Sequence, residues 1–274
     1  MVAARVSFGP LSPDPDERER QIDLADGYLA MLFKNGQAGP DQIDARENGQ
    51  HVVYTALTQP DAHEDRFCSE WSRRDREKVT EAFGHPPRWT LLDDDPEAFA
   101  KADWQGAPSL VVCTRWAFEN DLIGRGDDGE ELAIYLLPVS DQTREHLVHW
   151  GMHYRELDLV WLGSGDLEIP AYKQLVEPDS TLMEDGRRLA REVETATSLP
   201  TYMYLQRYYG RRTNEEARLC PGCGEAWYVG GDREGGYLEG FAFRCDACRL
   251  VSEMPSDTSD ERHARLGEYR APRS

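Results

Sequence analysis

Two closely spaced cysteine pairs near the C-terminal end of the chain constrain its fold more than any other feature. Cys220-Pro-Gly-Cys223 and Cys245-Asp-Ala-Cys248 are separated by twenty-one residues. Each pair, held in a tight turn, directs two sulfurs to one point, and a hairpin between the pairs brings the two points together. The spacing is typical of four thiolate ligands around one structural Zn²⁺ ion. Such a closed coordination shell leaves no position for a catalytic water.

The sequence between the two pairs supports such a hairpin, because segments 226–229 and 241–243 read as strands on either side of a glycine-rich turn. A redox dithiol and two disulfides are the alternatives. A thioredoxin-like site needs only one pair, and disulfides need an oxidising compartment. The N-terminus has no apolar export segment, and no stretch is apolar enough to span a membrane, so we expect a cytoplasmic protein. Cys113 follows an apolar run, and we interpret it as a buried strand thiol.

Hydrophobic periodicity predicts an α+β fold. Residues 1–138 alternate between strand and helix patterns and predict an N-terminal mixed α/β domain. Its expected helices cover 17–33 and 68–83, and its expected strands cover 5–8, 51–57, 89–92, 110–113 and 132–137. Residues 139–199 are expected to form a central helical segment, and residues 200–253 a zinc ribbon with an approach strand. The polar residues 254–274 are expected to be a disordered tail.

Three histidines, His146, His149 and His153, lie at helical spacing in the expected central segment. Two of them four residues apart could share a metal ion. The glutamate that follows the first histidine of a zinc protease motif is missing, however, and we interpret the three as histidines that flank or enter the core. The chain also has no nucleophile elbow and no cofactor fingerprint. We therefore expect a protein that is not an enzyme and binds no small-molecule cofactor.

The charge of the chain is strongly negative and unevenly distributed. It carries 31 basic and 51 acidic residues, a net charge of -20. Residues 201–251 contain seven arginines and seven acidic residues, so nearly all of the acidity lies upstream. A chain of this charge is repelled by phosphate backbones unless a local patch differs from the average, which argues against non-specific coating of nucleic acid.

The C-terminal half resembles a known bacterial family. The resemblance rests on Leu199-Pro-Thr-Tyr-Met-Tyr-Leu205, on Arg207-Tyr-Tyr-Gly210 and on the two cysteine pairs with the Leu-Val-Ser that ends at Ser252. It covers roughly the last 120 residues. The family is one of uncharacterised proteins described as containing a zinc ribbon and as candidates for nucleic-acid binding. The resemblance implies a soluble bacterial protein with a C-terminal zinc ribbon and no established activity. Met203 and Gln206 stand where further aromatic residues are expected.

Two functions compete. We favour a protein-partner adaptor, regulator or immunity-type protein that docks a basic partner through its acidic surface. The alternative is a nucleic-acid-binding protein that stacks bases on tyrosines and holds phosphates with arginines. The residues expected to contact a nucleic acid or a partner are Tyr202, Tyr204, Arg207, Tyr208, Tyr209, Arg211, Arg212 and Arg249.

Overall fold

The computed structural model describes residues 1–96, 101–112, 122–163, 165–232 and 234–271. Contacts between residues divide the chain into two compact units. Unit 1 contains residues 1–103 and 133–148, and unit 2 contains residues 104–132 and 149–274. The fold is mixed α+β, as predicted, with one sheet in each unit. Cys113 lies outside the described residues.

Unit 1 is built on a four-stranded antiparallel sheet in the order β2-β3-β1-β4. The strands are β1 (Val2–Pro10), β2 (Ala38–Glu47), β3 (Gln50–Leu57) and β4 (Arg88–Leu91). The helix α1 (Pro15–Lys34) connects β1 to β2, and α2 (Glu70–Phe83) connects β3 to β4. This βαββαβ order and these strand directions define a ferredoxin-like topology.

Local signals fix the ends of the two helices. The side chain of Asp14 accepts hydrogen bonds from the backbone N–H groups of Asp16 and Glu17, and caps α1. Ser69 caps α2 in the same way. Gly84 ends α2 with φ +76°, a conformation that favours glycine.

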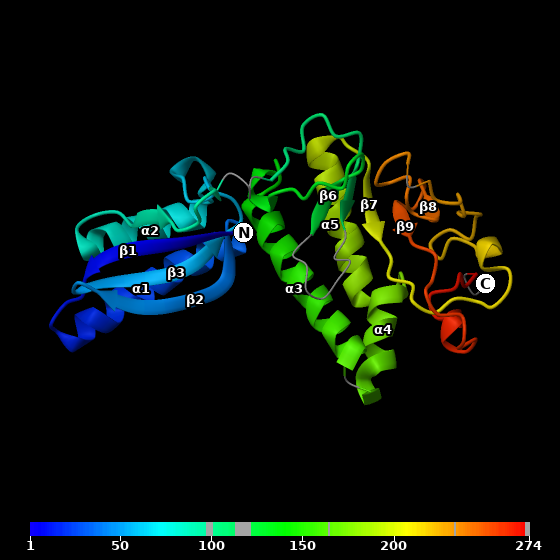
Figure 1. The fold of residues 1–274 in the computed structure, drawn as a ribbon, viewed down its shortest axis with the longest axis horizontal. Coiled ribbons are helices and arrows are strands. Elements are labelled where there is room, and N and C mark those ends of the chain that lie inside the picture. Colours follow the sequence, from blue (N-terminus) through cyan, green and yellow to red (C-terminus); the bar gives the residue numbers. More distant parts are fainter. Residues whose placement is uncertain (97–100, 113–121, 164, 233, 272–274) are drawn as a thin grey trace. The chain divides into compact units, whose positions relative to one another are not determined.

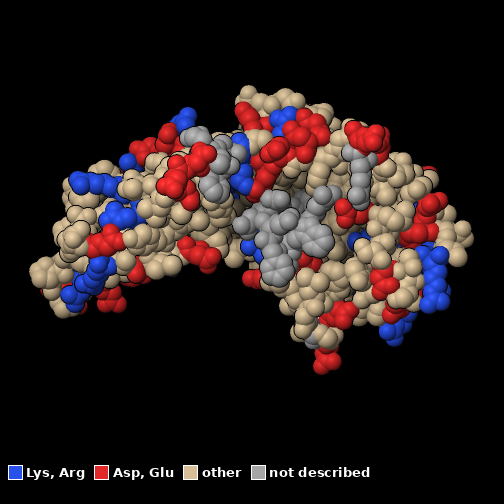
Figure 2. All heavy atoms as spheres, viewed as in Figure 1, with Lys and Arg blue, Asp and Glu red and all other residues tan. Residues whose placement is uncertain are grey.

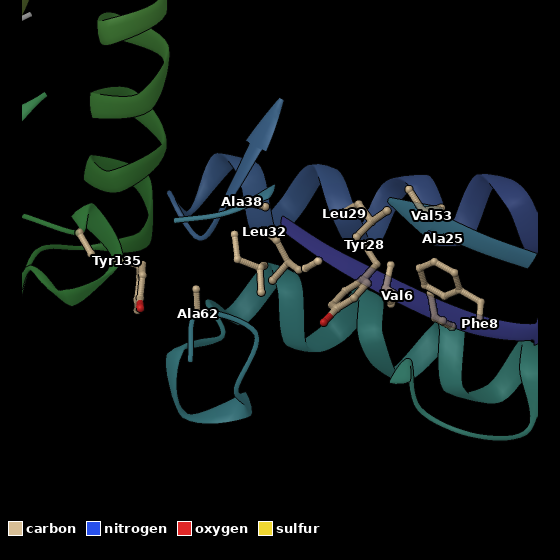
Figure 3. Close-up of a cluster of buried hydrophobic side chains, with 14 residues drawn as sticks. Val6, Phe8, Ala25, Tyr28, Leu29, Leu32, Ala38, Val53, Ala62 and Tyr135 are labelled. Atoms are coloured by element: carbon tan, nitrogen blue, oxygen red, sulfur yellow. The ribbon is translucent and has the colours of Figure 1, made fainter. Parts of the chain in front are cut away.

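The core of unit 1 lies between this sheet and α1, with α2 and the segment around Tyr135 packed against it (Figure 3). Val6 and Phe8 of β1 point toward the same cluster as Tyr28 and Leu29 of α1, and all four side chains are buried. The expected strand at 132–137 is instead a short 3₁₀ helix, η3 (Ile134–Leu136), whose neighbour Ala133 and central residue Tyr135 belong to this core.

Unit 2 has a five-stranded sheet in the order β6-β5-β7-β9-β8. The strands are β5 (Leu110–Val112), β6 (Ile123–Arg125), β7 (Thr201–Tyr204), β8 (Phe243–Cys245) and β9 (Leu250–Ser252). The central pairs β5–β7 and β7–β9 are parallel, and the two outer pairs are antiparallel. The hairpin that carries the second cysteine pair is therefore part of the unit 2 sheet.

This pairing explains why the units do not follow the domain boundaries expected from the sequence. β5 and β6 come from the expected N-terminal domain, yet they share a sheet with β7 and the strands of the expected ribbon. A parallel pair joins strands that are far apart in sequence. Leu110 and Thr201 pair in this way, and no local sequence pattern predicts a pair of strands so far apart.

The helices of the central segment are α3 (Asp141–Gly163), α4 (Glu168–Val176) and α5 (Thr181–Thr197). Figure 1 shows the unit 2 part of α3 alongside α4 and α5. The Trp150 indole N–H donates to the Leu182 carbonyl over 2.8 Å. A Cβ at Gly186 would lie 2.7 Å from the Trp150 ring and 2.9 Å from Met203, so glycine lets α3, α5 and β7 pack closely.

The C-terminal residues differ from the expected disordered tail. Asp257 forms a bridge with Tyr209, and η6 (His263–Arg265) follows. These residues are polar and have no periodic apolar pattern, so their composition alone predicts disorder. Many of their contacts are made by backbone carbonyls, which the sequence does not reveal. Among the described residues, no helix is both long enough and apolar enough to cross a membrane.

Candidate metal centre

The first cysteine pair lies in a tight turn closed by backbone hydrogen bonds. The Cys220 N–H donates to the Glu225 carbonyl over 2.8 Å, and the Gly224 N–H donates to the Cys220 carbonyl over 2.8 Å. Gly224 has φ +77°, which only glycine adopts without cost at the end of such a turn. We call residues 220–224 the first knuckle.

The second cysteine pair lies at the turn between β8 and β9. Cys245 ends β8 and pairs with Leu250 of β9, and the Cys248 N–H points at the Cys245 sulfur over 3.4 Å. Arg249 occupies the position that corresponds to Gly224 and has φ +52°, which is strained for arginine. We call residues 245–249 the second knuckle.

The two knuckles bring the four cysteine sulfurs together within 4.8 Å of one another. The Cys223 and Cys245 sulfurs, one from each knuckle, are 3.7 Å apart. A Cβ at Gly222 would lie 2.8 Å from the Cys248 sulfur, so a side chain here would push against a ligand from the other knuckle. Among the described residues, these four cysteines form the one group of His, Cys, Asp and Glu side chains that could hold a metal ion.

The environment of the thiols favours a bound cation. Burial, and then the neighbouring Cys245 sulfur, raises the pKa of Cys220 above its usual range. Burial and hydrogen bonding with Cys223 raise the pKa of Cys248 to about 12. Burial also opposes ionisation of Cys223, but the N–H of Glu225 and the Cys248 thiol outweigh it and lower its pKa. Four adjacent sulfurs become thiolates together only when a cation compensates their charge.

The residues before the first knuckle form a buried ionic cluster. The guanidinium of Arg207 lies over the rings of Trp227 and Phe243, at 5.3 and 4.3 Å from their centroids. Its charge is paired with Glu215, which also binds Arg218 at 3.3 Å. Burial, and then the nearby Arg218 charge, lowers the pKa of Arg207 to about 9. This cluster supports the backbone that leads to Cys220.

The predicted contact residues do not form one exposed surface. Tyr202, Tyr204 and Arg207 are buried, and burial with the neighbouring Asp246 raises the pKa of Tyr202 to about 12. Tyr209 donates to Glu168, whereas Tyr208 remains exposed on one side.

The three other predicted arginines already have partners. Arg211 pairs with Glu268, Arg249 pairs with Glu194, and Arg212 donates to the Ser259 carbonyl. Sequence reasoning did not identify Glu215 and Arg218, because nothing in the sequence distinguishes them from surface charges.

The histidines of α3 have no role in this centre. His146 and His153 are exposed and His149 is half-buried. Among the described residues, they belong to no group that could hold a metal ion.

The chain thus combines a mixed α+β fold with a cluster of four cysteines that could hold a metal ion. Residues 105–206 match the model of a domain of unknown function, DUF2310, and residues 210–258 match a second, DUF8594. Two proteins of Haemophilus influenzae, each described as an uncharacterized protein, are 34% identical over 166 residues, or 60% of this chain. The chain covers 80% of one relative and 62% of the other. It therefore belongs to an uncharacterised bacterial family.

A solved structure, titled "Structure of Rv0793 from Mycobacterium tuberculosis", is 20% identical and aligns with a TM-score of 0.27. The alignment covers 34% of this chain and 92% of that protein.

Proposed function

We propose that this protein is a non-enzymatic, zinc-containing binding protein that docks a basic protein partner through an acidic surface. In this proposal the two knuckles form a zinc ribbon that is fixed into the unit 2 sheet. The acidic surface lies in unit 1. Such a protein acts as an adaptor, a regulator or an immunity-type protein.

The sulfur geometry supports zinc as the metal. Thiolates at about 2.3 Å from a tetrahedral ion lie about 3.8 Å from one another, and the Cys223–Cys245 distance is 3.7 Å. Four sulfur ligands exclude hard cations that prefer oxygen. All four ligand positions are protein sulfurs, so the ion stabilises the fold and offers no site for a substrate. A thiolate centre fits a reducing compartment such as the cytoplasm.

The observation that carries the proposed docking surface is a stripe of carboxylates on α1. Exposed acidic side chains lie at intervals of three and four residues, which places them on one face of the helix: Asp16, Glu19, Asp23 and Asp26. We call these four residues the acidic stripe. Partial burial and the charge of Asp44 on β2 raise the pKa of Asp26, whereas His51 opposes this shift and Asp23 adds a smaller increase. Clustered negative charge of this kind favours a cationic partner.

Nucleic-acid binding is less well supported. Figure 2 shows acidic side chains over both units and no continuous band of Lys and Arg on the described part of this face. Residues 1–200 carry 39 acidic and 20 basic residues, a net charge of -19. The aromatic side chains that would stack on bases are largely buried, which leaves Tyr208 as the most exposed of them.

The test is affinity capture with the full chain from lysate of the source bacterium, carried out with and without nuclease treatment. A variant with Glu19→Gln, Asp23→Asn and Asp26→Asn removes three charges from the acidic stripe. A control variant with Glu77→Gln, Glu81→Gln and Asp94→Asn removes three exposed charges elsewhere in unit 1.

The proposal predicts that wild type and control retain the same basic protein and that the stripe variant loses it. Equal capture by all three proteins contradicts the proposed surface. Recovery of nucleic acid that disappears after nuclease treatment favours the alternative function.

A further inference from the structure

The C-terminal residues 257–270, which we call the strap, run back over the segment that leads to the first knuckle. The Gly210 N–H donates to the Asp257 carbonyl over 2.7 Å, and the Asp257 N–H donates to the Tyr208 carbonyl over 3.0 Å. The backbone N–H of Arg212 donates to Glu261 over 2.9 Å. The strap therefore begins with a ladder of backbone contacts beside residues 208–212.

The next part of the strap binds the residue two positions before Cys220. Arg218 is buried, and its Nη2 donates to the carbonyls of Ala264 and Leu266. Glu268 accepts from Arg211 Nε and Nη2 over 3.0 and 2.8 Å, and lies 3.6 Å from Arg218 Nη2. Charge-assisted contacts of this kind are stronger than neutral hydrogen bonds when they are partly buried.

The last part of the strap contacts the first knuckle directly. A Cβ at Gly224 would lie 2.6 Å from a carbon of the Tyr269 ring, so this ring packs against the backbone immediately after Cys223. A Cβ at Gly267 would lie 2.5 Å from the Val176 carbonyl oxygen, which shows how closely the strap meets the end of α4. The strap thus holds the first knuckle on both sides, at Arg218 and at Gly224.

A cavity of about 230 Å³ remains beside this contact, lined by residues that include Pro221 and Gly222 of the knuckle and Glu268 of the strap. Cys223 is half-buried, whereas Cys220 is buried. A small molecule in this cavity lies beside the backbone of the first knuckle, and release of an ion held by the sulfurs would require that backbone to move. Contacts that hold the knuckle backbone oppose that movement.

We propose that the strap is a lid on the metal centre that controls how fast the ion is released. With the strap closed, Tyr269 packs on the knuckle and Glu268 binds Arg218 just before it, and together they keep the knuckle in its ligating conformation. When the strap opens, the first pair of sulfurs can separate from the second. An ion held there would then transfer to an external ligand, and the freed thiolates would take up protons from the solvent. The inference rests on the proposed metal centre.

The test measures transfer of zinc from the full-length, zinc-loaded protein to the chromogenic chelator 4-(2-pyridylazo)resorcinol. Tyr269→Ala is expected to accelerate transfer about tenfold, which corresponds to a barrier lowered by about 1.4 kcal/mol. Tyr269→Phe keeps the ring and is expected to restore the wild-type rate. Arg265→Ala changes an exposed side chain of the strap and is the matched control.

Glu268→Gln is a second test variant that leaves the Tyr269 ring in place. It is also expected to increase the rate of zinc transfer. Equal transfer rates for wild type, Tyr269→Ala and Glu268→Gln overturn the strap proposal. If wild type binds no zinc, the proposed metal centre fails instead. The zinc content measured before transfer therefore distinguishes the two failures.

Discussion

Arg249, the residue after the fourth cysteine, donates hydrogen bonds from Nε and Nη2 to the two carboxylate oxygens of Glu194 on α5, over 2.9 and 3.0 Å. The same guanidinium lies 5.5 Å from the centroid of the Tyr202 ring on β7. The pair connects the second knuckle to a helix and a strand of unit 2. These contacts explain why an arginine, and not a glycine, occupies a left-handed backbone position.

The pair makes stability depend on pH. Hydrogen bonds from Arg249 lower the pKa of Glu194 in the folded protein, although burial opposes this effect. The unfolded chain therefore binds the proton first as pH falls. The stabilisation is fully present above the ordinary glutamate pKa of about 4.3 and is lost as pH falls through the lowered value.

We predict that Glu194→Gln destabilises the protein by about 1 kcal/mol at pH 7. The difference from wild type should shrink below about pH 4.3. Urea unfolding of both proteins between pH 7 and pH 3 measures this difference in stability. A difference that stays constant over this range contradicts the assigned role of the pair.

In the buried ionic cluster, the loss of a single carboxylate is expected to lower the stability of the protein strongly. Glu215 is the carboxylate that Arg207 and Arg218 share. Its replacement in Glu215→Ala leaves two arginines buried without it, at a cost of about 3–5 kcal/mol in the free energy of unfolding. Glu216→Ala, next in sequence and exposed, is the control and should cost less than about 0.5 kcal/mol. Denaturant unfolding measures the stability of both variants. A similar loss of stability in Glu215→Ala and Glu216→Ala would refute the buried cluster.

The contact between the knuckles predicts a specific effect on metal affinity. A methyl group in Gly222→Ala would lie 2.8 Å from the Cys248 sulfur and must displace that ligand. We expect zinc affinity to fall at least about tenfold, or ~1.4 kcal/mol. Gly163→Ala, at the end of α3 with nothing within 4 Å of its Cβ, should leave affinity unchanged. Competition with a chelator measures the zinc affinity of both variants. An unchanged affinity in Gly222→Ala rules out the close approach of Gly222 to the Cys248 sulfur.

The sequence predicted the cysteine cluster because the ligands of each knuckle are local. Only two residues lie between Cys220 and Cys223, and a tight turn is enough to bring their sulfurs together. The α1 and α2 helices were predictable for the same reason, since Ser69 and Gly84 mark the ends of α2 in the sequence itself.

Other features had weak signals or none. The polar strand β2 was missed, although Asn48-Gly49, with φ +50° and +80°, is a hairpin turn signal that was available. The pairing of β9 with β7 joins Leu250 to Met203 and depends on tertiary packing. The burial of Arg207 could not be predicted from sequence either. Its ion-pair partner Glu215 looks like a surface charge in the sequence, and the rings of Trp227 and Phe243 come next to Arg207 only when the chain folds.

Metal analysis of the purified full-length protein shows whether the four cysteines hold zinc. We expect one zinc ion per wild-type chain, and less than about a tenth of that in a Cys220→Ser, Cys245→Ser double variant, because two sulfurs hold zinc far more weakly than four. Wild-type protein without zinc, or a double variant that retains the wild-type amount, would contradict it.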